Sequence, residues 1–179
     1  MDHFQEIREK LAERELDAMM LTNEANRLYA TGFHSTDTDG LALVTRKNTY
    51  YFTDSRYTEA AQRVIKNAVM REVGAGRGYG VLVEEVIREE GLQKIGFEDA
   101  YMTVQDYERY RKALSCELVP ATDLMLQLRM VKSEEELEAM RQEKLQQLRE
   151  KRSNFRYALG NKLFGEKGYE KLKKILKRD

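Results

Sequence analysis

Short apolar runs alternate with helix-like segments along the first 130 residues, and this alternation is typical of a layered α/β architecture. Lys47 and Asn48 form a tight-turn signal between two of the β-rich runs, so we expect a hairpin and therefore a partly antiparallel sheet. The strands that the sequence predicts are residues 18–21, 41–45, 49–53, 68–73, 94–98 and 117–119.

Helices are expected between these strands, because apolar residues there recur at helical spacing. The first helix carries Phe4, Ile7 and Leu11 on one face. Helix boundaries are indicated by Gly32, by Asp54 or Ser55, by Gly91 and by Thr103. For the helix after Asp54, the expected buried face consists of Tyr57, Ala60, Ala61, Val64 and Ile65.

The balance of charge divides the chain near residue 141. The whole chain has 31 Lys and Arg against 31 Asp and Glu, but residues 141–179 have 13 against 5. A single cysteine, Cys116, cannot form an internal disulfide and indicates a reducing compartment. No apolar run approaches the ~20 residues of a membrane helix, and the N-terminus has no signal-peptide pattern. We therefore expect a cytoplasmic protein.

The polar loop after Gly32 is the strongest candidate for a functional segment, since loops on a rigid scaffold commonly carry function. It contains His34, one of two histidines, together with Asp37 and Asp39. A plain alternative is that His34 is simply exposed or hydrogen-bonded to one of these aspartates.

Other sites are not supported by the sequence. The glycines of residues 74–80 lack the spacing of a nucleotide-binding loop, and residues 37–40 lack the glutamate of a calcium loop. Only His3, in a terminus expected to fray, and His34 could join a metal site, so no metal ligands are assigned. Cys116 has no adjacent activating residue and is interpreted as a buried cysteine that packs as a small apolar side chain. We assign no catalytic residue or cofactor to this chain.

Four ordered blocks give the chain a resemblance to the N-terminal, creatinase-type domain of the Xaa-Pro peptidases, the family of aminopeptidase P, prolidase and creatinase. The first is Asn26-Arg27-Leu28-Tyr29-Ala30-Thr31-Gly32-Phe33. The others are Thr53-Asp54-Ser55-Arg56-Tyr57, Ile95-Gly96-Phe97-Glu98 and the junction-like residues 128–137. The resemblance covers about 140 residues.

This resemblance implies a ribonuclease-H-like α/β domain with a mixed sheet and flanking helices. It also implies a catalytic domain after the junction, with a dinuclear manganese, cobalt or zinc centre, that is expected to be missing from this chain. In dimeric members the loop after the Gly-Phe pair reaches over the partner subunit's active site. That gating role maps onto Phe33, His34, Asp37 and Asp39, whereas Arg56 and Asp54 are expected to tie the hairpin to the next helix.

The sequence predicts a boundary between a domain of residues 1–132 and a basic helical extension of residues 133–179. Ser133 begins a capping signature for a helix expected to stop at Ser153-Asn154, and a second amphipathic set follows Gly165. Glu166 and Glu170 dilute the basic face, so packing on the same domain or on a second copy is favoured over nucleic acid or membrane binding. A fusion or frameshift would also explain the change of pattern.

Two functions follow as expectations. In the first, the chain is a non-catalytic domain for dimerisation and substrate gating, in a homodimer or with a peptidase catalytic domain, which alone would bring proline-containing peptides. In the second, it is a stand-alone binding or scaffold module whose basic tail contacts a protein, nucleic acid or membrane partner.

Overall fold

A six-stranded mixed sheet forms the centre of the first unit, residues 1–131, in the computed structural model, which describes the backbone of residues 3–36, 39–132 and 134–175. The strand order is β4-β3-β2-β1-β5-β6. The β1–β2 and β2–β3 pairs are antiparallel, which confirms the hairpin, and the other pairs are parallel. The strands are β1 (Ala18–Leu21), β2 (Leu41–Thr45), β3 (Thr49–Thr53), β4 (Val69–Glu72), β5 (Lys94–Phe97) and β6 (Glu117–Pro120).

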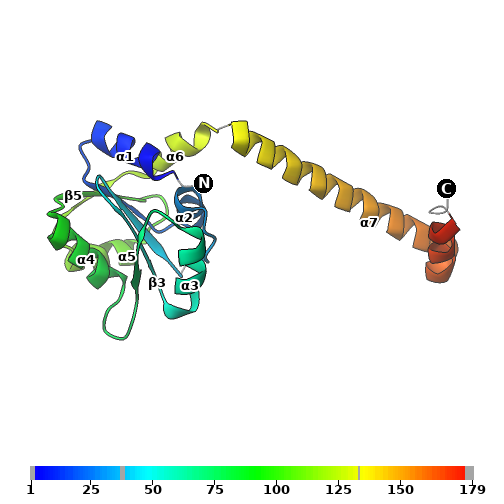
Figure 1. The fold of residues 1–179 in the computed structure, drawn as a ribbon, viewed down its shortest axis with the longest axis horizontal. Coiled ribbons are helices and arrows are strands. Elements are labelled where there is room, and N and C mark those ends of the chain that lie inside the picture. The colour runs from blue at the N-terminus through cyan, green and yellow to red at the C-terminus, as the bar shows by residue number, and fades with distance from the viewer. Residues whose placement is uncertain (1–2, 37–38, 133, 176–179) are drawn as a thin grey trace. The chain divides into compact units, whose positions relative to one another are not determined.

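Helices cover both faces of this sheet (Figure 1). α1 and α6 lie side by side over one face, where α2 and α3 also contribute buried residues, and α4 and α5 cover the other. The helices are α1 (Phe4–Glu13), α2 (Glu24–Thr31), α3 (Ser55–Val64), α4 (Tyr79–Glu90), α5 (Val104–Ala113), α6 (Thr122–Met130) and α7 (Glu134–Ile175). The α/β mixed-sheet fold is therefore confirmed.

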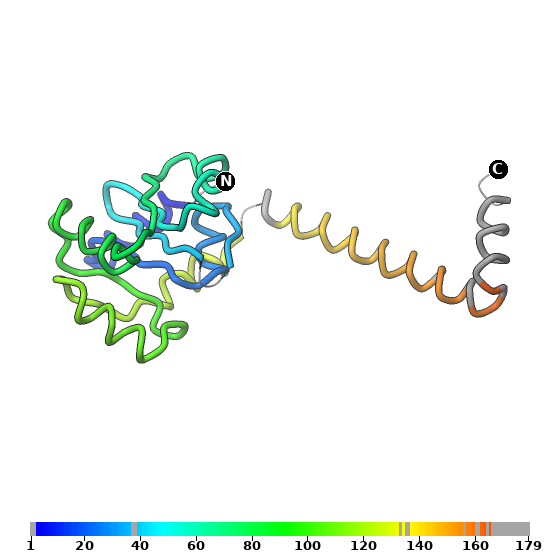
Figure 2. Tube along the Cα trace, turned by 90° about the horizontal axis from the view of Figure 1, so that it is seen from below, coloured from blue at the N-terminus to red at the C-terminus, as the bar shows by residue number. Residues whose placement is uncertain are grey.

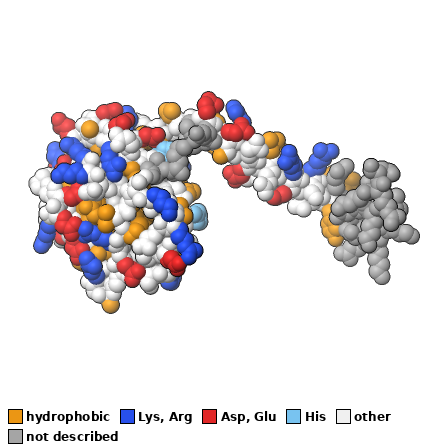
Figure 3. All heavy atoms as spheres, in the orientation of Figure 1, with side chains coloured by type: hydrophobic (Ala, Val, Ile, Leu, Met, Phe, Trp, Pro, Cys, Tyr) orange, Lys and Arg blue, Asp and Glu red, His pale blue; other side chains and the backbone are white. Residues whose placement is uncertain are grey.

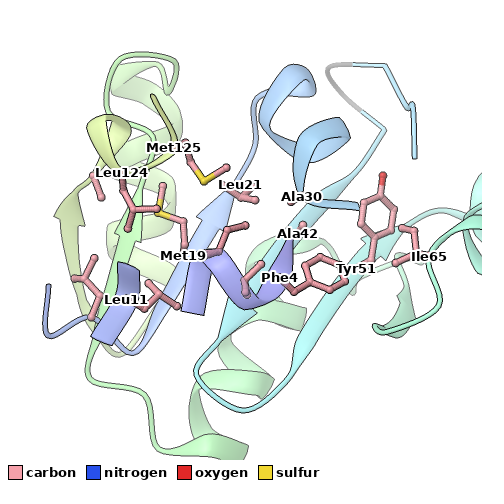
Figure 4. Packing of buried hydrophobic residues seen from close by; sticks show 14 of the residues in the cluster. Phe4, Leu11, Met19, Leu21, Ala30, Ala42, Tyr51, Ile65, Leu124 and Met125 are labelled. Carbon is pink, nitrogen blue, oxygen red and sulfur yellow. The ribbon is translucent and has the colours of Figure 1, made fainter. Parts of the chain in front are cut away.

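The central strands are buried on both faces, which explains why they read as unbroken apolar runs. All four residues of β1 have no exposed surface. Met19 and Leu21 point into the cluster under α1 and α6 (Figure 4), and Ala18 and Met20 into the cluster under α4 and α5. Each side chain of β1 therefore packs against one of the two helix layers.

The predicted helix boundaries are confirmed where they depend on local chemistry. Asp54 accepts a hydrogen bond from the backbone N–H of Arg56, and Thr103 accepts one from that of Asp106. Gly32 and Gly91 end α2 and α4 with φ of 70° each, a conformation that other residues rarely adopt.

The predicted buried face of α3 is wrong in part. Ala61 and Ile65 are buried, but Ala60 is exposed and Val64 is 47% exposed. α3 packs beside the edge strand β4, whose own Val69 is 47% exposed, so little of the sheet is available to cover a wide apolar face.

The second compact unit, residues 132–179, contains α7. The predicted stop at Ser153-Asn154 is wrong, because the helix continues to Gly165, where φ is 67° and ψ is 165°; its long course is visible in Figure 2. Ser and Asn each cost a helix only about 0.5 kcal/mol relative to Ala, and the good helix formers around them outweigh that cost. Ser133, the expected cap, lies outside the described residues. Among the helices that the structure describes, none is both long and apolar enough to cross a membrane.

Candidate functional site

The candidate loop leaves the sheet through α2, which is held at both ends. The side chain of Asn23 caps its start by accepting a hydrogen bond from the backbone N–H of Asn26, at 3.2 Å. At its end, Gly32 turns the chain in the left-handed conformation. The loop therefore begins at a helix end whose conformation is fixed.

The buried side chain of Arg27 fixes the middle of the loop. This side chain is only 1% exposed, and its guanidinium donates hydrogen bonds to the carbonyl oxygens of Thr22 and Thr36, the latter at 2.6 Å. It also lies 3.4 Å from the carbonyl oxygen of Ser35. Arginine suits this role because several donors in one plane can bind separate carbonyl groups.

Phe33 and Asp39 anchor the two sides of the loop. Phe33 is 8% exposed and meets the ring of Tyr51 edge-on, with 5.9 Å between centroids. The Asp39 carboxylate accepts hydrogen bonds from Arg56 Nη2 at 3.1 Å and Tyr57 OH at 3.3 Å. Arg56 also binds Asp54, so these residues join the loop to the start of α3.

His34 projects from the anchored loop. Its side chain is 67% exposed, and Nε2 lies 2.8 Å from Glu24 Oε1 rather than beside Asp39. The structure thus separates the predicted loop residues into a buried anchor, Phe33, a partly buried anchor, Asp39, and one exposed imidazole with a carboxylate partner. Asp37 lies outside the described residues.

Glu98 is a buried polar residue whose role the sequence did not reveal. Its carboxylate has no solvent exposure and accepts hydrogen bonds from the backbone N–H groups of Thr22 and Asn23, the second at 2.7 Å. It also accepts one from Asn26 Nδ2 at 2.6 Å, and Arg129 donates to Asn26 Oδ1 at 2.9 Å. Glu98 and Asn26 both belong to the quoted sequence blocks, which were the only signal available.

A cleft of about 700 Å³ opens beside this network. Its lining residues come from the carboxyl ends of β1 and β5, the start of β2 and the helices α4 and α5. They are Thr22, Asn23, Gly40, Leu41, Tyr79, Tyr101, Met102, Asp106, Arg109 and Tyr110. Of the exposed loop residues that the structure describes, neither His34 nor Thr36 lines it.

The other two titratable candidates, His3 and Cys116, are packed within the domain. His3 is packed rather than frayed, because its ring stacks on Tyr29 with 4.0 Å between centroids and Nδ1 lies 2.8 Å from Glu6. Cys116 is half-buried, and burial, with the nearby charge of Glu84, raises the pKa of its thiol to about 11. Within the described ranges, no three His, Cys, Asp or Glu side chains come together as metal ligands. These residues therefore do not fit the dinuclear centre that the resemblance implies for a catalytic domain.

Comparison with known proteins identifies the family. A family model described as the Creatinase/Prolidase N-terminal domain matches residues 4–131, which is most of the chain. This chain belongs to the creatinase/prolidase N-terminal domain family. The predicted resemblance is thereby confirmed.

Relatives with known sequences or structures place this domain within longer peptidases. The chain is 31% identical over 140 residues to the uncharacterized peptidase YqhT of Bacillus subtilis (strain 168), covering 76% of this chain and 38% of that protein. It is 29% identical to the Xaa-Pro dipeptidase of Bacillus anthracis, with a TM-score of 0.67 and coverage of 76% and 38%. The chain thus spans less than half the length of these relatives.

An isolated creatinase/prolidase N-terminal domain has the same fold. The N-terminal domain of the cytoplasmic peptidase PepQ of Mycobacterium tuberculosis H37Rv is 25% identical, with a TM-score of 0.62. The match covers 70% of this chain and 96% of that structure.

Proposed function

We propose that this creatinase/prolidase N-terminal domain serves an Xaa-Pro peptidase as a dimerisation and substrate-gating domain in the cytoplasm. The metal centre and proline-containing peptide substrates would belong to a catalytic domain outside the matched region. Family membership supports this proposal, as does the length of the relatives, of which the chain spans 38%.

The anchored loop carries the gating part of the proposal. A group that contacts substrate from outside the active site must be exposed on a rigid support. His34 is exposed, and Arg27, Phe33 and Asp39 hold the backbone on either side of it. We assign substrate contact to His34, with Glu24 orienting the imidazole.

A chimera tests this function. Residues 1–131 would replace the corresponding domain of the Bacillus anthracis Xaa-Pro dipeptidase, and kcat and KM would be measured on an Xaa-Pro dipeptide. We expect an active dimer in which His34→Ala raises KM several-fold, whereas Lys66→Ala, an exposed change just beyond the end of α3, has no effect. A monomeric or inactive chimera that is correctly folded would contradict the proposal, as would an unchanged KM in His34→Ala.

A second candidate function rests on α7, which exposes an apolar stripe. Leu145, Leu148, Phe155, Leu159 and Leu163 recur at helical spacing, and each is 44–67% exposed. Lys144, Lys151 and Arg149 border this stripe, and Glu143 and Glu150 lie on the opposite side of the helix by the same spacing. Figure 3 shows acidic side chains over the first turns of α7 and basic ones farther along.

This arrangement favours an anionic lipid surface, since basic side chains beside an apolar stripe can reach lipid headgroups. The diluting Glu166 and Glu170 lie beyond the break at Gly165 and so belong to another segment. Pairing with a second copy is less favourable, because a heptad through Leu145, Leu148 and Phe155 would place Arg152 in the seam.

Vesicle sedimentation tests the second function with the full chain. We expect binding to vesicles of phosphatidylcholine and phosphatidylserine, weakened by salt and by Leu148→Glu. Tyr157→Glu, the same charge change on the opposite side of α7, should bind as the parent does. Equal binding to pure phosphatidylcholine, or none at low salt, would overturn this candidate.

A further inference from the structure

The cleft lies where the connections of the sheet diverge. β1 and β5 are parallel neighbours, so their carboxyl ends lie at the same edge. The chain leaves β1 through α2, on one face, toward β2; it leaves β5 through α5, on the other face, toward β6. In open α/β sheets such a switch point leaves a crevice at the carboxyl ends, and ligands bind there.

The walls of this cleft are fixed by hydrogen bonds rather than formed by mobile chain. The Glu98 carboxylate holds the backbone of Thr22 and Asn23 on the β1 side. The Glu98 carbonyl oxygen accepts hydrogen bonds from the backbone N–H groups of Tyr101 and Met102, at 3.0 and 2.9 Å. Glu98 therefore positions the backbone that follows β1 and β5 on two sides of the cleft, which lowers the cost of ordering these segments on binding.

Three tyrosines give the cleft aromatic surfaces at different depths. Tyr110 is 5% exposed, Tyr79 is half-buried and Tyr101 is 46% exposed. Burial, with the nearby charges of Asp39 and Asp54, raises the pKa of Tyr79 to about 12, so its hydroxyl remains a hydrogen-bond donor at neutral pH. A ligand with a planar aromatic ring suits these tyrosines, because stacked or edge-on contact between aromatic rings is energetically favourable.

Arg109 supplies a positive charge at the same place. Its guanidinium binds Asp106 at 2.7 Å and lies 5.4 Å from the centroid of Tyr110. A guanidinium has five N–H donors, and Asp106 can accept only some of them, so others remain for an anion. The 12-residue helix α4 also begins at the cleft, and its N-cap Gly78 has no side chain to bind the first N–H groups.

We propose that this cleft binds a small planar aromatic carboxylic acid, with its ring among Tyr79, Tyr101 and Tyr110 and its carboxylate at Arg109. The site adjoins the gating loop at Gly40 but does not include His34, and it does not depend on the proposed peptidase role. Its occupant would couple to the network of Glu98 and Asn26, which also supports α2.

Titration of the ¹⁵N-labelled full chain with 2-naphthoate, followed by NMR, tests this assignment. We expect saturable shifts at Thr22, Asn23, Tyr101 and Met102, and binding about tenfold weaker for the neutral analogue 2-naphthylmethanol, because charge-assisted hydrogen bonds are lost. The comparison of the two compounds needs no variant, so it is independent of folding effects.

Variants of two arginines on α5 give the matched control. Arg109→Gln should weaken 2-naphthoate about tenfold, and Arg111→Gln, which changes an exposed arginine paired with Glu108 outside the cleft, should leave it unchanged. The site is refuted by absence of saturable shifts at millimolar 2-naphthoate, by shifts elsewhere only, by equal binding of the neutral analogue, or by equal effects of the two substitutions.

Discussion

Glu98 illustrates how one buried side chain can determine local geometry. Oε2 accepts from Thr22 and Asn23, and Oε1 accepts from Asn26, whose own amide oxygen accepts from Arg129. A buried carboxylate is costly unless its oxygens are satisfied, and here donors surround both of them.

Glu98→Gln should lower the free energy of unfolding by about 2–3 kcal/mol, measured by urea denaturation. The new amide NH₂ would face either the two backbone N–H groups or the Asn26 amide NH₂, leaving donors without acceptors. The exposed Glu117→Gln should change stability by less than about 0.5 kcal/mol. Equal stability of the two variants would show that the network is not essential.

Cys116 should react slowly in the folded protein. Because burial raises the pKa of its thiol to about 11, the thiolate fraction at pH 8 is far below that of a free cysteine. We expect alkylation by iodoacetamide at pH 8 to be at least about tenfold slower than for the urea-unfolded chain, whose thiol has a pKa near 8.5. Similar rates in the two states would contradict this environment.

Among the elements, Gly96 of β5 is closely packed against β1, the segment after α1 and the start of α6. A methyl group on Gly96 would lie 2.9 Å from Met19 Sδ and 3.0 Å from Ala121 Cβ and Leu16 Cδ1. Gly96→Ala should therefore destabilise the protein by about 1–3 kcal/mol in thermal or urea unfolding. Gly74→Ala is the control, because a methyl group there would meet no atom within 4 Å; equal effects would exclude crowding as the cause.

Asp99 links the end of β5 to the start of α6 and should make stability depend on pH. Its carboxylate accepts hydrogen bonds from the hydroxyl and backbone N–H of Thr122, and these bonds lower its pKa below 3.8. A lowered folded-state pKa gives stability that is fully present above the unfolded-state pKa and is lost as pH falls through the folded-state value.

Urea unfolding at pH 6 and pH 3 measures this contribution. Asp99→Asn should be less stable than the parent at pH 6, and the difference should shrink at pH 3, since the substitution removes the titrating group. The same loss of stability between pH 6 and pH 3 in both proteins would contradict the assignment.

Elements defined by local chemistry could be predicted from the sequence. The β1 run, the hairpin at Lys47-Asn48 and the caps at Asp54 and Thr103 depend on residues close together in the chain. The pairing of Glu98 with Thr22 joins residues 76 apart, so no local pattern could reveal it. The exposure of Val64 on α3 results from its position beside the edge strand β4. The spacing of apolar residues does not specify which strand lies at the edge.

The sequence predicts which loop forms the candidate site, but not how the side chains of that loop are arranged. The sequence placed His34 and Asp39 in one polar segment, yet only packing shows that Asp39 is held by Arg56 while His34 faces outward with Glu24. The cleft was not predicted, because its walls come from five elements brought together by the strand order.

For the whole molecule, gating across the dimer requires two copies, in which the loop of one serves the active site of the other. The chimera contains the Bacillus anthracis catalytic domain. Mixed dimers of two chimera variants distinguish gating across the dimer from gating within one subunit. One copy would carry His34→Ala and a working metal site; the other would carry His34 and an inactivated metal site.

The KM of this mixed dimer for an Xaa-Pro dipeptide is the most direct test. We expect the mixed dimer to have the KM of the unmodified chimera, because its single working active site lies under an intact loop, whereas the homodimer of His34→Ala should have a raised KM. A mixed dimer whose KM stays as high as that of the His34→Ala homodimer would contradict gating across the dimer.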